Sequence, residues 1–93
     1  MKKKDLDKIL DASYHMEIGL LMKDDEGRAW HWGIVSKDRN GRYVLLQRID
    51  SEYYDPIVEV RIKPSYVLKA RTWYGAEVTI KDGEIKVIRD DDE

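Results

Sequence analysis

The fold is decided by residues 14–36, which read YHMEIGLLMKDDEGRAWHWGIVS. Apolar and polar side chains alternate with a period of two in residues 14–22 and again in residues 30–34, a pattern typical of half-buried β-strands. Between these runs, residues 25–27 combine two acidic side chains with a glycine, which favours a tight turn. The segment therefore predicts an antiparallel β-hairpin.

The length of the turn sets the register of this hairpin. A three-residue loop, Asp25-Glu26-Gly27 with its glycine in the left-handed conformation, places Leu20 opposite Trp32. We prefer this loop because it sets apolar side chains beside each other, and a slip of one residue would not. The register assigns Trp32 to the core. It also places Gly19 opposite Gly33 on the outward face, where paired glycines indicate either a bend of the sheet or a shallow groove.

The rest of the chain continues in short antiparallel elements. Asn40-Gly41 predicts a two-residue turn that places Ser36 opposite Leu45, and Asp82-Gly83 predicts a second two-residue turn. An N-terminal helix capped by Asp5 is expected to bury one stripe of apolar side chains. The expected elements are the helix from Asp5 to about Ala12, with its stripe Leu6, Ile9 and Leu10, strands over residues 43–50, 57–63 and 68–73, a helical turn over 64–67, and a hairpin over 77–88.

A strand meander followed by one helical turn and another strand resembles the SH3-like barrel. The resemblance covers residues 28–72, where Trp32-Gly33-Ile34-Val35, Tyr43-Val44-Leu45 and Val58-Glu59-Val60 are similar to Tudor-type members. It implies a mainly β protein, a small antiparallel SH3-like barrel with a short N-terminal helix and an added C-terminal β-hairpin. The resemblance also implies a binding module. We expect one domain over residues 1–89 and a disordered acidic tail over residues 90–93.

Composition narrows the class of protein. The chain has 93 residues, is 39% charged and contains no cysteine, which excludes disulfides and zinc–thiolate sites. No apolar run approaches the ~18 residues of a membrane span, and no signal-peptide core follows Met1, so we expect a cytoplasmic protein without membrane contact. Gln47 and Asn40 are the only amide residues, which favours a thermophilic source.

Charge is divided along the chain. Residues 28–74 hold nine Lys or Arg against five Asp or Glu, whereas residues 1–27 hold five against seven and residues 75–93 hold three against seven. This division is either ordinary solvated charge or a basic binding face. As an alternative function, basic central strands could bind nucleic acid while aromatic side chains stack on its bases. The candidate cations are Arg28, Arg48, Arg61, Lys63 and Arg71, with Arg39, Arg42 and Lys69 as further members.

Catalytic and metal-binding patterns are absent from the sequence. His31 is expected to pair across strands with Asp50, and such a pair can orient an imidazole for proton transfer. No nucleophile accompanies it, so a charge pair without catalytic function is the preferred interpretation. His15 is predicted to lie too far from His31 to share a metal ion. We therefore expect no enzyme activity, no metal and no cofactor.

The aromatic residues indicate where a partner binds. All nine are Trp or Tyr, types that are favoured at interfaces. We expect Trp30, Tyr53 and Tyr54 to gather at one barrel end and Trp73 and Tyr74 to form a second pair; the alternative is that these rings are structural lids. The first hypothesis is a non-enzymatic module that docks a protein partner there. A small inhibitor from a mobile element is a further alternative, and the oligomeric state is open.

Overall fold

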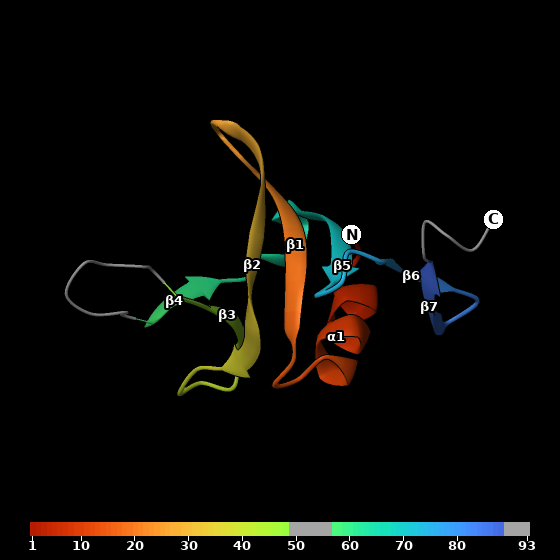
Figure 1. The fold of residues 1–93 in the computed structure, drawn as a ribbon, viewed down its shortest axis with the longest axis horizontal. Coiled ribbons are helices and arrows are strands. Elements are labelled where there is room, and N and C mark those ends of the chain that lie inside the picture. Colours follow the sequence, from red (N-terminus) through yellow and green to blue (C-terminus); the bar gives the residue numbers. More distant parts are fainter. Residues whose placement is uncertain (49–56, 89–93) are drawn as a thin grey trace.

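The computed structural model describes residues 1–48 and 57–88. Within them the fold is mainly β, with the predicted short N-terminal helix and C-terminal hairpin (Figure 1). The elements are α1 (Lys3–Ala12), β1 (Glu17–Asp24), β2 (Gly27–Lys37), β3 (Tyr43–Arg48), β4 (Ile57–Arg61), the 3-10 turn η1 (Pro64–Tyr66), β5 (Val67–Thr72), β6 (Glu77–Lys81) and β7 (Glu84–Ile88).

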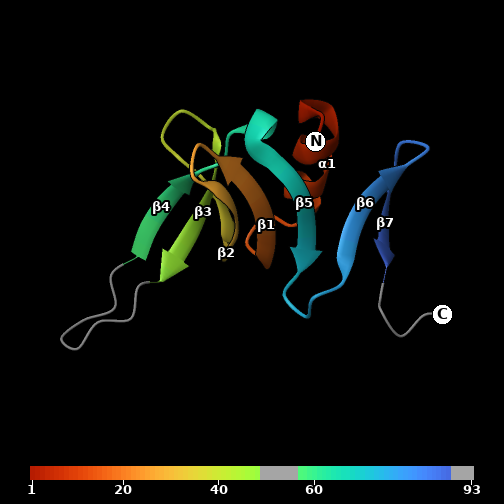
Figure 2. The same ribbon diagram turned by 90° about the horizontal axis from the view of Figure 1, so that it is seen from above.

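The seven described strands form one antiparallel sheet in the order β4-β3-β2-β1-β5-β6-β7. Figure 2 shows β4 and β7 at opposite ends of this sheet, so the predicted closed barrel does not form among the described residues. The physical reason is that β5 pairs with β6, which extends the sheet beyond β5. The meander β1 to β4, followed by η1 and β5, keeps the order of elements that carried the SH3-like resemblance, and the family itself stays a prediction.

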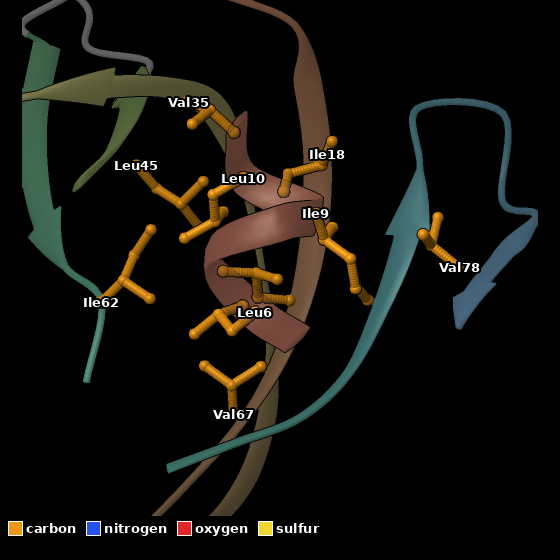
Figure 3. Close-up of a cluster of buried hydrophobic side chains, with 11 residues drawn as sticks. Leu6, Ile9, Leu10, Ile18, Val35, Leu45, Ile62, Val67 and Val78 are labelled. Atoms are coloured by element: carbon orange, nitrogen blue, oxygen red, sulfur yellow. The ribbon is translucent and has the colours of Figure 1, made fainter. Parts of the chain in front are cut away.

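The core lies between α1 and one face of the sheet. Leu6, Ile9 and Leu10 form the predicted helical stripe and are all buried. Figure 3 shows them packed among buried side chains from the strands, including Val35 of β2 and Leu45 of β3. Since α1 is the one α-helix of the described residues, the opposite face of the sheet carries no helical cover.

We call that opposite face, on strands β1 to β5, the open face. Side chains alternate between the two faces of a strand, and directly paired residues of antiparallel strands share a face. The open face therefore comprises Glu17, Gly19, Leu21, Lys23, Arg28, Trp30, Trp32, Ile34, Ser36, Val44, Leu46, Arg48, Ile57, Glu59, Arg61, Lys69 and Arg71.

The β1–β2 hairpin differs from the prediction by one residue. Asp24 pairs with Gly27, so the loop has two residues, and Trp32 lies opposite Gly19. Asp24 Oδ1 accepts a hydrogen bond from the Glu26 N–H at 2.8 Å, and Gly27 takes a φ of 130°, which together favour the tighter turn. The prediction that Trp32 lies in the core is therefore wrong, because the shift by one residue turns its ring to the open face.

The predicted pairing of Gly19 with Gly33 is wrong for the same reason. Gly33 pairs with Ile18 and is buried where β2 and β3 approach closely. A Cβ atom at Gly33 would lie 2.7 Å from the Leu46 carbonyl oxygen, and one at Gly19 would lie 2.7 Å from the ring of Trp32. The absence of a side chain at Gly33 thus makes room for a backbone carbonyl, and its absence at Gly19 makes room for an indole.

The β2–β3 loop is one residue longer than predicted. Asp38 Oδ1 accepts hydrogen bonds from the N–H groups of Asn40 at 2.8 Å and Arg42 at 3.0 Å. Gly41 supplies a positive φ of 78°, as the last residue of a three-residue hairpin loop does. The two-residue Asn-Gly turn is therefore wrong, and Ser36 pairs one residue away from its predicted partner.

The remaining elements are close to their predicted bounds. Around Asp82-Gly83, Val78 pairs with Val87, as expected. The helix begins at Lys3 without a side-chain cap, so the predicted capping by Asp5 is wrong and its carboxylate lies in the first helical turn.

Candidate binding surfaces

The open face carries two tryptophans side by side. The ring centroids of Trp30 and Trp32 are 5.9 Å apart, with an angle of 25° between their planes. Three ring atoms of Trp32 lie within 2.8 Å of the point where a Gly19 Cβ would be, so its six-membered ring lies over Gly19. Trp32 is 38% exposed. The missing side chain of Gly19 thus lets an indole lie along the sheet with surface left for a ligand.

Cationic side chains accompany both tryptophans. Gly19 of β1 lies between Trp32 of β2 and Arg71 of β5. Two residues further along β1, Leu21 lies between Trp30 and Lys69. Two strand spacings separate each pair, about 10 Å between backbones. The guanidinium carbon of Arg71 reaches to 4.6 Å from the centroid of the Trp30 ring, within the range of a cation–π contact.

The charge of the open face contrasts with that of the whole chain. Its described residues include six cations, Lys23, Arg28, Arg48, Arg61, Lys69 and Arg71, and two acidic residues, Glu17 and Glu59. The full chain has a net charge of −2. Cations are thus concentrated on the surface that carries the exposed Trp32 and the half-buried Trp30, and such a field attracts anionic ligands.

The structure describes three of the five aromatic residues that the sequence predicted as binding residues: Trp30, Trp73 and Tyr74. Trp30 lies on the open face, whereas Trp73 and Tyr74 lie in the turn after β5. Tyr53 and Tyr54 lie outside the described residues, so their predicted cluster with Trp30 stays a prediction. Trp32 was missed as a site residue because Leu20 and Leu21 make β1 apolar on both faces, which lets the apolar pattern fit either register.

Four of the five predicted binding cations are brought onto the open face: Arg28, Arg48, Arg61 and Arg71. Lys63 follows β4, and its ammonium lies 5.2 Å from the ring centroid of Tyr66. Lys69 joins the open face, whereas Arg39 and Arg42 lie on the β2–β3 loop.

A second surface is an apolar groove of about 220 Å³ between the end of α1 and the β6–β7 hairpin. One end of it carries Trp73 and Tyr74, whose ring centroids are 5.1 Å apart and nearly perpendicular, at 84°. We call it the hairpin groove. Its described lining is Ile9, Ala12, Ser13, Met16, Glu17, Ile18, Thr72, Trp73, Tyr74, Val78, Ile85 and Val87.

A larger cleft of about 590 Å³ lies between α1, the β2–β3 loop and the end of β4. Four cations and two acidic residues line it: Lys3, Lys37, Arg42, Arg61, Asp7 and Asp11. Nearby, the backbone N–H of Arg42, above all, holds the pKa of the Asp38 carboxyl below its usual value. One of the cations that line the cleft, Lys3, is paired with Asp7 at 3.2 Å.

His31 is half-buried and lies opposite Leu20, whereas its predicted partner Asp50 is outside the described residues. In residues 1–48 and 57–88, no group of three or more His, Cys, Asp or Glu residues could hold a metal ion. Over the same residues, no helix has the length and hydropathy needed to cross a membrane.

No known family, curated protein or solved structure matches the chain.

Proposed function

We propose that the protein is a non-enzymatic binding module whose open face binds single-stranded nucleic acid. The observation that carries the proposal is the Trp30–Trp32 pair, which lies on an uncovered sheet beside the Arg71 guanidinium. Exposed aromatic rings accept unpaired bases by stacking, and neighbouring cations neutralise the phosphates between them.

Single strands are favoured over a duplex because stacking on an indole needs a base whose face is free. Trp32, whose ring lies over Gly19 and which is 38% exposed, offers such a surface. The cations lie on both sides of the tryptophans, with Lys69 and Arg71 on β5 and Arg48 and Arg61 on β3 and β4. A strand that crosses the sheet could therefore meet a cation before and after the stacked bases.

The experiment is a fluorescence anisotropy titration with a labelled oligothymidylate of about twelve nucleotides. We expect binding that weakens as salt rises from about 20 to about 200 mM, because phosphate contacts release counterions. Trp32→Ser should reduce the affinity by about 5- to 150-fold, which corresponds to one lost stacking contact.

A matched control separates the open face from general positive charge. Arg71→Gln should weaken binding and flatten its salt dependence, whereas Arg39→Gln on the exposed β2–β3 loop should change both little. The proposal is wrong if no salt-sensitive binding occurs at low ionic strength, or if Trp32→Ser binds as the wild type does. Self-association lost in Trp32→Ser would instead identify the open face as a contact between copies.

An SH3-like relationship is a second part of the proposal. Its support is the order β4-β3-β2-β1-β5, with the 3-10 turn η1 between β4 and β5. In a closed barrel, side chains of the strands alone would fill the inner side of the sheet. In this interpretation α1 packs against that side instead, and the C-terminal hairpin extends the sheet.

A further inference from the structure

The hairpin groove exposes apolar side chains from three separate segments. Trp73 in the turn after β5 is 64% exposed, Met16 before β1 is 51% exposed, and Val87 of β7 is 44% exposed. All three line the same groove. Apolar surface gathered in one place on a small domain marks a contact site more often than scattered apolar residues do.

The size of the groove indicates what kind of ligand it suits. Its volume of about 220 Å³ lies below the roughly 300–1,000 Å³ of pockets that enclose a drug-sized molecule. One or two large side chains that project from a larger body would fill it. The perpendicular rings of Trp73 and Tyr74 supply a wall for such side chains.

The α1 end of the groove is electronegative. Glu17, the first residue of β1, lies where the open face meets the groove and is the one charged residue among the described lining residues. The helix ends beside it, at Ala12, with no basic residue in its last turn, so the partial negative charge of the helix C-terminus is not offset there. Lys8, the last cation of α1, is engaged by the Gly83 carbonyl oxygen across the hairpin. The groove therefore favours a positive charge next to an apolar anchor.

We infer that the hairpin groove is a second binding site, which holds a partner-protein segment that carries a large apolar side chain next to a Lys or Arg. Apolar anchors in a groove are a recurrent mode of peptide recognition. The site lies between α1 and the β6–β7 hairpin, and neither Trp30 nor Trp32 is among its described lining residues.

The test begins with a phage-displayed library of random peptides about twelve residues long, selected on the full-length protein. We expect enriched peptides to carry Trp, Phe, Leu or Met next to Lys or Arg. Labelled synthetic copies are then titrated by fluorescence polarisation. Trp73→Ser should lower the affinity for these peptides about tenfold or more, because tryptophans that become buried on binding contribute much of the binding energy at such contacts. Trp32→Ser, the matched control on the open face, should leave the affinity unchanged.

Charge reversal tests the electrostatic part of the inference. Glu17→Lys should weaken the selected basic peptides and strengthen copies in which Glu replaces the basic residue. Met16→Gln gives a second apolar variant in case Trp73→Ser changes the fold, and thermal unfolding of each variant reports that change. The inference is overturned by a library without enriched peptides, or by peptides that bind both groove variants as they bind the wild type. Self-association of the wild type that Trp73→Ser abolishes would also overturn it, since a second copy would then fill the groove.

Discussion

Gly33→Ala is the substitution whose effect follows most directly from the strand register. A Cβ atom at this position would lie 2.7 Å from the Leu46 carbonyl oxygen and 3.1 Å from its carbonyl carbon. These are backbone atoms of a paired strand and cannot move without breaking the β2–β3 ladder. Overpacking of this kind costs about 1–3 kcal/mol, and alanine recovers about 0.5–1 kcal/mol because glycine is unfavourable inside a strand. The midpoints of these two ranges differ by about 1.2 kcal/mol, which is the net destabilisation that we expect.

Urea unfolding followed by circular dichroism measures this change, with Gly19→Ala as the matched control. A Cβ atom at Gly19 meets only the ring of Trp32, which can swing toward solvent, so Gly19→Ala should cost less stability and change the tryptophan fluorescence more. The corresponding drop in Tm for Gly33→Ala is roughly 4–8 °C per kcal/mol for a domain of this size. An unchanged or raised stability of Gly33→Ala would refute the close approach of β2 and β3.

Three further predictions test other parts of the molecule. Leu10→Ala should cost about 2–5 kcal/mol in denaturant unfolding, because the side chain is buried between helix and sheet. The pKa of Asp38 is lowered from 3.8, mainly by the Arg42 N–H, so the stabilisation it contributes is present at neutral pH and lost as the pH falls below about 3.8. NMR should show that the amides of Asn40 and Arg42 lose protection, relative to their intrinsic exchange rates, below that pH, and that this loss is absent in Asp38→Asn. Trp73→Ser should leave the Tm nearly unchanged, because the ring is largely exposed.

The helix and the last hairpin could be predicted from sequence because local signals determine them. Leu6, Ile9 and Leu10 repeat with the helical period, and all three are buried. Asp82-Gly83 sits between two runs whose apolar residues pair in only one register, and that pairing is observed. In both cases the turn or the period alone decides which side chains face the core.

The face of β2 could not be predicted, because its register depends on hydrogen bonds within the turns. Asp24 and Asp38 each accept backbone N–H bonds that set the loop length, one shorter and one longer than the composition suggested. Whether the sheet closes into a barrel could not be predicted from the sequence either, since closure depends on whether β5 pairs with β6. For the binding surface, the bias to Trp, Tyr and Arg was visible in the sequence, but its assembly around Trp32 required the true register.

Binding of single-stranded nucleic acid to the open face is tested by an NMR titration of the isotope-labelled protein with oligothymidylate. We expect the indole N–H signals of Trp30 and Trp32 and the amide signals of β1, β2 and β5 to shift together. Signals of α1, on the other side of the sheet, should stay in place. If the shifts are confined to α1 or to the hairpin groove, or if no signal shifts at low salt, the open face does not bind single-stranded nucleic acid.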